Sequence, residues 1–207
     1  MPASVLRRAL LALMVLARPA TLGAQQRFEI TSYAGGYIPT TKLGIIQLRL
    51  AGTPTSLEAE AATAAGLGAR LGFWGNGRLA VEASYFYSKP KLRSTTGFLT
   101  QTVEGTVQSG SLVAMYRVTG GQTGTDLVIK GGIVGINHGG PGFQLASGQF
   151  DLGGTVGAGL RMDLSRTATF RIDGETFLYS WSPGPAFNDR FQTDVVMSAG
   201  LALRLGR

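Results

Sequence analysis

The sequence predicts an all-β fold, an eight-stranded antiparallel up-and-down transmembrane β-barrel. The first observation is that apolar residues alternate with small or charged ones along segments of about a dozen positions. The second is that short turns alternate with long loops. The third is the composition of the 207 residues: 31 are Gly, 15% are charged and none is Cys. Without Cys the chain has no disulfide framework, thiolate metal site or cysteine nucleophile.

Residues 1–24 have the pattern of a secretory signal peptide that is removed from the mature protein. Arg7 and Arg8 precede an uncharged apolar run over residues 9–17, and the segment ends at Ala24. The apolar run is too short to span a membrane as a helix, which needs about 20 residues. We therefore expect one folded domain, an outer-membrane β-barrel domain over residues 25–207.

The positive charge of the chain is partly a property of this leader. The whole sequence has 19 Lys and Arg against 12 Asp and Glu, a net charge of +7 that favours nucleic acid or an anionic membrane surface as a partner. Without residues 1–24, 16 bases remain against 12 acids, a net charge of +4. Export and the weaker charge together argue against binding to nucleic acid.

Eight segments carry the period-two alternation of a β-strand. Along residues 153–164, for example, Val156 and Leu160 share one face and Arg161 lies on the other. These segments are long compared with the five or six residues typical of strands in soluble proteins. The predicted strands are residues 26–38, 63–74, 79–89, 106–118, 127–138, 152–164, 168–180 and 192–206.

The connections between these strands support a barrel that crosses a membrane. The short ones are residues 75–78, 119–126 and 165–167, and the first contains the Asn-Gly pair of tight hairpins. The long ones are residues 39–62, 90–105, 139–151 and 181–191. Short periplasmic turns and long external loops are typical of outer-membrane barrels. A secreted soluble sandwich or lipocalin-like barrel also alternates, but it does not require this regular difference in loop length.

Two further expectations concern the long first loop. Ten strands are an alternative if Lys42–Leu50 pairs as an extra hairpin of the barrel. The Ala- and Glu-rich Leu57–Ala65 is expected to form at most a short turn of helix.

Parity assigns seven bases and six acids to the inside of the barrel. An eight-stranded lumen is only as wide as its side chains, so these charges must pair closely, because an unpaired buried charge costs several kcal/mol. Six glycines on the same face are expected to give the arginines space: Gly66, Gly68, Gly72, Gly153, Gly157 and Gly159. The predicted lumen charges are Arg27, Glu29, Arg70, Glu82, Arg117, Lys130, Arg161, Asp163, Arg171, Asp173, Glu175, Asp194 and Arg204.

The two ends of the mature chain carry a family resemblance. Phe28-Glu29-Ile30, with Gly35-Gly36-Tyr37 after it, and the last predicted strand resemble the small outer-membrane β-barrels of Gram-negative bacteria, similar to the N-terminal barrel of outer membrane protein A. The resemblance implies insertion in the outer membrane, with its lipids, periplasmic chaperones and the barrel-insertion machinery as partners. It also implies a C-terminal assembly signal at Ser198, Gly200, Leu203 and Leu205. The family usually ends on an aromatic residue, whereas this chain ends Gly206-Arg207.

The sequence predicts no catalytic residue, no cofactor and no metal site. His138 is the only histidine, in a glycine-rich stretch, and we expect it to be a solvated loop residue. The glycines at 66–72 miss the spacing of a dinucleotide-binding loop. Lys89, Lys91 and Arg93 cluster near the second long loop, where they would meet the phosphates of lipopolysaccharide.

These observations favour a non-enzymatic integral outer-membrane protein with a structural or surface-interaction role and a lumen filled by paired charges. A narrow channel for small solutes is the alternative. A membrane enzyme that modifies lipid A, with His138 as its minimum requirement, is the third interpretation.

Overall fold

The computed structural model describes residues 27–41, 44–50, 53–75, 77–96, 99–119, 124–143, 150–181 and 190–205. The predicted signal peptide over residues 1–24 lies outside these ranges. Along them the chain forms strands joined by turns and one 3-10 turn, η1 (Pro141–Phe143). The described residues include no helix that is long and apolar enough to cross a membrane.

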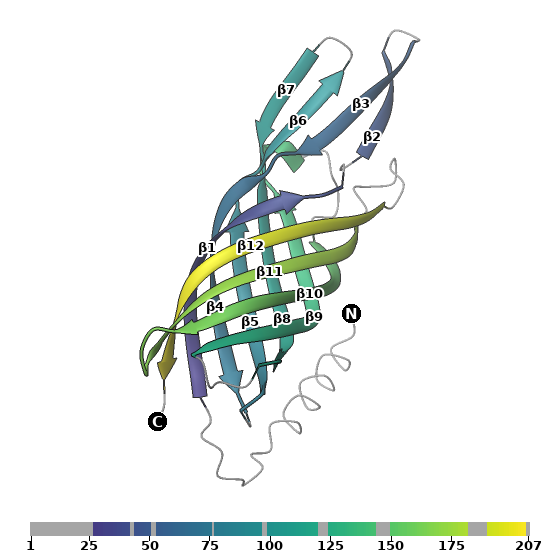
Figure 1. Cartoon of the computed structure of the whole chain (residues 1–207). Coiled ribbons are helices and arrows are strands. Elements are labelled where there is room, and N and C mark those ends of the chain that lie inside the picture. The colour runs from purple at the N-terminus through teal and green to yellow at the C-terminus, as the bar shows by residue number, and fades with distance from the viewer. Residues whose placement is uncertain are drawn as a thin grey trace, which may run out of the picture.

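Eight of the strands form a closed antiparallel barrel (Figure 1). Their order around the barrel is β1, β12, β11, β10, β9, β8, β5, β4, so neighbours are consecutive along the chain once the outer strands β2, β3, β6 and β7 are set aside. The predicted eight-stranded up-and-down barrel is therefore confirmed, and each predicted strand coincides with one barrel strand to within about two residues. The barrel strands are β1 (Arg27–Pro39), β4 (Ala64–Trp74), β5 (Leu79–Ser88), β8 (Thr106–Arg117), β9 (Thr125–Gly139), β10 (Phe150–Asp163), β11 (Ala168–Trp181) and β12 (Arg190–Leu205).

The remaining strands form a separate four-stranded sheet beyond the loop end of the barrel (Figure 1). They are β2 (Gly44–Leu50), β3 (Thr53–Ala61), β6 (Lys91–Thr96) and β7 (Leu99–Glu104), paired in the order β2-β3-β6-β7. The ten-stranded alternative is wrong, because the hairpin that begins near Lys42 pairs with β6 and not with a barrel strand. The helical turn expected over Leu57–Ala65 is also wrong, since ladder pairing overrides the helix propensity of Ala and Glu.

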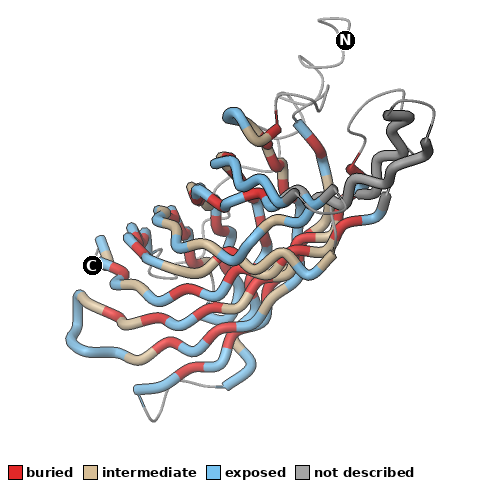
Figure 2. The backbone as a smooth tube through the Cα atoms, turned by 90° about the horizontal axis from the view of Figure 1, so that it is seen from above, coloured by how far each residue is buried: buried red, intermediate tan, exposed pale blue. Residues whose placement is uncertain are grey.

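The barrel presents its apolar side outward and its polar side inward. Along β5, Leu79 and Val81 are exposed while Ala80 and Glu82 are buried, and the same alternation follows the other barrel strands (Figure 2). Phe28, Phe73 and Tyr116 are exposed near the short-turn end. A soluble sandwich or lipocalin-like barrel would bury the apolar face instead. Transmembrane barrels have the arrangement seen here, with apolar residues outward and polar residues inward.

The interior has three layers along the barrel axis. Aromatic and aliphatic side chains, with Phe86, Tyr179 and Trp181 among them, fill the end that carries the long loops. Charged side chains fill the middle. A smaller apolar cluster that includes Trp74, Met115 and Val128 lies near the short turns. The candidate functional site is this filled lumen.

Candidate functional site

Six buried charges fill the middle of the lumen, and each is at most 6% exposed. They come from β4, β5, β9 and β11, and the register places Lys130 and Glu175 opposite the same residue of β10, Gly157. Three bases face three acids, so the group is neutral. We call these residues the central cluster: Arg70, Glu82, Lys130, Arg171, Asp173 and Glu175.

Every acid of the central cluster contacts at least two of its bases. Lys130 Nζ donates to Asp173 Oδ1 at 3.1 Å and to Glu175 Oε1 at 2.8 Å. Arg171 Nη2 donates to the same Asp173 oxygen at 3.1 Å. The third acid, Glu82, accepts from both terminal nitrogens of Arg171. Shared partners of this kind give charge-assisted hydrogen bonds that hold one another in place.

Arg70 of β4 connects the central cluster to the neighbouring strand β1 and to β12 beyond it. Its Nη2 donates to Glu175 Oε1 at 2.8 Å and to the hydroxyl of Ser198 on β12 at 2.9 Å. Its Nη1 lies 3.3 Å from Asp173 Oδ2. The guanidinium also stacks 3.7 Å from the centre of the Tyr33 ring on β1. The Arg171–Glu82 pair joins β11 to β5 on the opposite side of the barrel, so the cluster reaches across the lumen.

A second charged group lies closer to the short turns and centres on Glu29. Its carboxylate accepts from Arg161 Nη2 at 2.6 Å and 2.7 Å, and from Trp74 Nε1 at 3.0 Å. Arg204 Nε lies 3.4 Å from the same carboxylate, and the Arg204 guanidinium also contacts Asp163. Glu29 is thus saturated by partners from three other strands.

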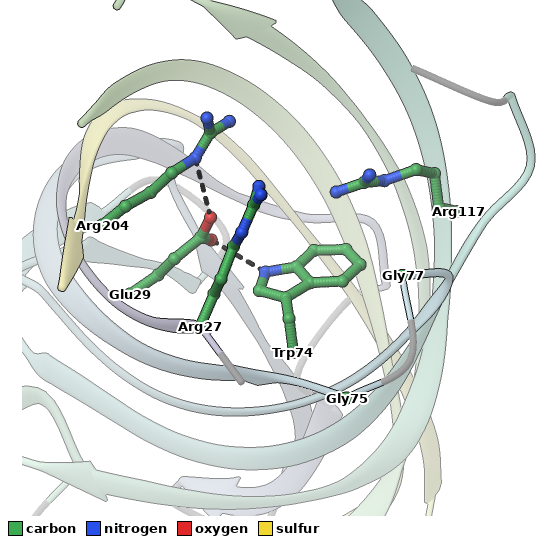
Figure 3. Close-up of a pocket in the computed structure, with 7 residues that line it drawn as sticks. All are labelled: Arg27, Glu29, Trp74, Gly75, Gly77, Arg117 and Arg204. Atoms are coloured by element: carbon green, nitrogen blue, oxygen red, sulfur yellow. Dashed lines mark hydrogen bonds and ion pairs between the residues drawn. The ribbon is translucent and has the colours of Figure 1, made fainter. Parts of the chain in front are cut away.

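Below this group the barrel opens into a cavity of about 280 Å³. Figure 3 shows Arg27 and Arg117 extending from opposite sides toward the space beside the Trp74 ring. The guanidinium of Arg117 lies 4.7 Å from the centre of that ring, and its Nε is 3.1 Å from Asp126 Oδ2. The cavity, which we call the mouth cavity, is lined by Arg27, Glu29, Trp74, Gly75, Gly77, Arg117 and Arg204.

His138 corrects the sequence interpretation, because it is 1% exposed and not solvated. It lies on β9, which extends to Gly139, and its side chain points into the loop end of the lumen. Its Nδ1 is 3.5 Å from Asp151 Oδ2, and its Nε2 is 3.3 Å from the Tyr179 hydroxyl. The ring packs against Phe143 of η1, with the ring centres 5.0 Å apart.

Asp194 belongs to this loop-end layer and not to the central cluster. Its Oδ2 accepts hydrogen bonds of 2.7 Å from both Tyr37 and Tyr179. Pairing among the lumen charges predicts a base as the partner of Asp194, but two tyrosine hydroxyls take that place. Parity puts Tyr179 and Trp181 inside, which favours a bulge or a seventh strand that ends before them. That interpretation is wrong, because β11 continues to Trp181 and both side chains are buried in the lumen.

The predicted lumen charges differ in how deeply they are enclosed. Arg27 is exposed at the mouth, and the side chain of Asp163 is 39% exposed. Arg117 and Arg204 are half-buried beside them. Sequence reasoning missed Asp126, which is buried against Arg117 and shares the parity of Lys130. That parity would have found it if the predicted strand had begun one residue earlier.

The inward glycines accommodate rings and acids more than arginines. A Cβ on Gly66 would meet the Phe86 ring, and one on Gly68 would meet the Tyr33 ring. Gly157 and Gly159 lie against Glu175 and Asp173 in the same way. The expected space for arginines is provided only indirectly. Gly68 leaves room for the Tyr33 ring, and Arg70 stacks on that ring.

The other predicted sites lie on the barrel surface and at its loop end. Ser198 and Gly200 of the predicted assembly signal face the lumen from β12, whereas Leu203 and Leu205 are exposed on the outer face. Lys89, Lys91 and Arg93 are exposed where β5 leads into β6. Within the described ranges, His, Cys, Asp and Glu side chains form no group that could hold a metal ion.

Comparison with known proteins identifies the fold. No family model and no curated protein sequence matches the chain. The outer membrane protein OprG from Pseudomonas aeruginosa matches with a TM-score of 0.63 and 15% identity, over 89% of this chain and 97% of that one. Neisserial surface protein A matches with a TM-score of 0.56 and 14% identity, over 86% and 97%. The N-terminal β-barrel domain of Pseudomonas aeruginosa OprF matches with a TM-score of 0.52 and 13% identity, over 87% and 98%. The chain has the fold of the small outer-membrane β-barrels.

Proposed function

We propose that this chain is an integral protein of the outer membrane, with a structural or surface-interaction role and a lumen closed to solutes. Its fold likeness to outer-membrane barrels and its outward apolar face support the location. The observation that carries the closed lumen is the central cluster, in which three bases and three acids contact one another across the barrel.

The energetics of the central cluster support a closed lumen. Opening a path for an ion requires at least one of these side chains to swing away from its partners. Breaking a buried ion pair on one side leaves an uncompensated charge, at a cost of about 3–5 kcal/mol. The apolar layer with Phe86 and Trp181 adds a second barrier toward the loops.

Conductance in planar lipid bilayers tests this proposal against the channel alternative. We expect the full-length protein to insert without steady openings. A variant that truncates four members of the central cluster without changing the net charge, Arg70→Ala, Arg171→Ala, Glu82→Ala and Asp173→Ala, should open a small pore, after heat-modifiable migration on a gel confirms that it folds. Steady openings of the unaltered protein would establish the channel instead.

His138 supports a non-enzymatic role. The histidine of a catalytic triad uses one ring nitrogen for a carboxylate and the other for the nucleophile. Here the nitrogen that faces away from Asp151 is near the Tyr179 hydroxyl, which is buried and already donates a hydrogen bond to Asp194, so it is not placed as a nucleophile. Lipid A deacylation or acyl transfer that is lost in His138→Ala would instead favour the lipid-modifying enzyme.

The surface role includes contact of Lys89, Lys91 and Arg93 with lipopolysaccharide phosphates. All three are exposed at the loop end, where the four-stranded sheet begins. The strand register pairs Lys91 with Glu104 and Arg93 with Glu60, so these acids weaken the positive field of the cluster. Removing the bases and removing the acids should therefore change lipopolysaccharide binding in opposite directions.

Lipopolysaccharide that co-purifies with the extracted protein measures this contact. Replacing Lys89, Lys91 and Arg93 together with Gln should reduce retention, and replacing Glu60 and Glu104 with Gln should increase it, because the bases then act unopposed. Equal retention by the triple variant and the unaltered protein would remove the proposed contact.

A further inference from the structure

We propose that the mouth cavity binds a small oxyanion, through a phosphate or carboxylate group that enters from the short-turn end of the barrel. That this end faces the periplasm rests on the proposed function, whereas the site itself rests only on the lining residues. The cavity lies outside the central cluster, so the proposal holds whether or not the lumen conducts.

The first support is the net positive charge of the cavity lining. Arg27, Arg117 and Arg204 line it, and Glu29 is the only acid in the described lining. Glu29 is already saturated by Arg161, Trp74 and Arg204. Arg117 is paired with Asp126, which does not line the cavity, so Arg27 is the least compensated of the three bases. Arg27 and Arg117 extend toward the same space (Figure 3). An anion between these two guanidinium groups would relieve their repulsion.

The second support is the chemistry of the donors. Arginine forks match the geometry of phosphate and carboxylate oxygens and bind them through paired hydrogen bonds. The guanidinium of Arg161 lies 4.8 Å from the centre of the Trp74 ring. Its Nε and Nη1 are buried without a hydrogen-bond partner in the described part of the chain. The positive charge of Arg161 adds to the field that attracts an anion to the mouth.

The third support is the charge distribution along the barrel. Among the described residues near the short turns, six arginines stand against three acids: Arg27, Arg78, Arg117, Arg161, Arg166 and Arg204 against Glu29, Asp126 and Asp163. The central cluster above them is neutral. A rim with a net positive charge around a low-dielectric opening concentrates anionic solutes there.

Trp74 makes the proposal measurable, because it lines the cavity and the chain has only one other tryptophan, Trp181, at the opposite end. In a Trp181→Phe background, all tryptophan emission comes from Trp74. The protein is folded in a detergent that lacks phosphate and titrated with inorganic phosphate or, separately, acetate, at ionic strength held constant with sodium chloride. We expect a saturable change in emission, and the two arms distinguish phosphate from carboxylate recognition.

Variants then assign the binding to the mouth cavity. Arg27→Gln and Arg117→Gln should each raise the apparent Kd at least about tenfold, because each removes charge-assisted hydrogen bonds to the anion. Arg78→Gln is the matched control, since Arg78 is an exposed arginine of the same end that does not line the cavity, and its Kd should be unchanged. Heat-modifiable migration verifies that every variant is folded.

Two outcomes would overturn the proposal. One is an emission change that rises linearly with phosphate and is matched by sodium chloride alone, which indicates screening without a site. The other is an equal loss of affinity in Arg78→Gln and in the two cavity variants, which indicates a general effect of net charge. Neither outcome bears on conductance, so the proposed function would stand.

Discussion

At the scale of single residues, Tyr33 shows how glycine and aromatic side chains cooperate inside the barrel. Its register partners on the two neighbouring strands are Gly68 on β4 and Gly200 on β12. A Cβ on either glycine would meet the Tyr33 side chain. The tyrosine lies between these two glycines, and Arg70 stacks on its ring. Gly200 therefore has a packing role besides its place in the predicted assembly signal.

Gly200→Ala tests that packing role. We expect a loss of about 1–3 kcal/mol in the free energy of unfolding, because the added methyl overpacks the Tyr33 site. Urea unfolding and refolding in lipid vesicles measures it without the insertion machinery. Gly36→Ala is the control, since a Cβ there has no atom within 4 Å, and it should be near neutral. If both variants unfold at the same urea concentration, Gly200 acts in recognition alone.

Lys130→Met tests the charge balance of the central cluster. The variant leaves three buried acids facing two bases, and we expect it to lose about 3–5 kcal/mol of folding free energy. The double variant Lys130→Met and Glu175→Gln restores the balance and should recover part of that loss. The same urea assay compares them, and a double variant that loses the sum of the two single losses would show that neutrality is unimportant.

At the scale of the elements, the period-two pattern was sufficient to predict the barrel strands and the faces of their residues. Parity placed Arg70, Lys130 and Arg171 inside, where they are. Parity does not fix the depth of a residue along the barrel axis, which depends on register. Depth separates the exposed Arg27 from the buried Arg171, and it places Asp194 among tyrosines.

At His138 two sequence signals disagree, and the local one, a run of glycines, is misleading. It shares the parity of Lys130, which indicates an inward position, but the glycines after it favoured a loop. The structure extends β9 to Gly139, so the inward assignment is the right one. The outer sheet was missed for a different reason, since short strands in long loops have no length or burial pattern that separates them from irregular loops.

The outer sheet is predicted to be dispensable for barrel formation. Residues 44–55 cover β2 and the start of β3, and in the described structure β2 pairs only with β3. Replacing them with a Gly-Gly linker should leave heat-modifiable migration unchanged, because no barrel ladder includes them. Removing an equal number of residues from β11 should abolish it. Failure of the loop variant to fold would mean that the outer sheet guides closure.

At the scale of the whole molecule, the inverted sidedness of the barrel makes a lipid environment part of its stability. Ile133 is 56% exposed near the middle of β9, and Leu164 is 63% exposed at a short turn. Ile133→Arg should cost about 2–4 kcal/mol in vesicles, since it places a charge near the midplane, whereas Leu164→Arg should cost about 0–1 kcal/mol near the interface. Similar losses for both variants would contradict the proposed position in the membrane.

The seam of the barrel joins the first described strand to the last, from Phe28 opposite Leu205 to Pro39 opposite Asp194. Before β12 joins the barrel, the sheet has two unpaired edges, and unpaired edges can pair with other chains. The seam also completes two polar contacts, Glu29 with Arg204 and Tyr37 with Asp194. A chain whose β12 has not yet joined therefore leaves polar groups of its interior without partners. Only the complete chain can close the barrel and satisfy them.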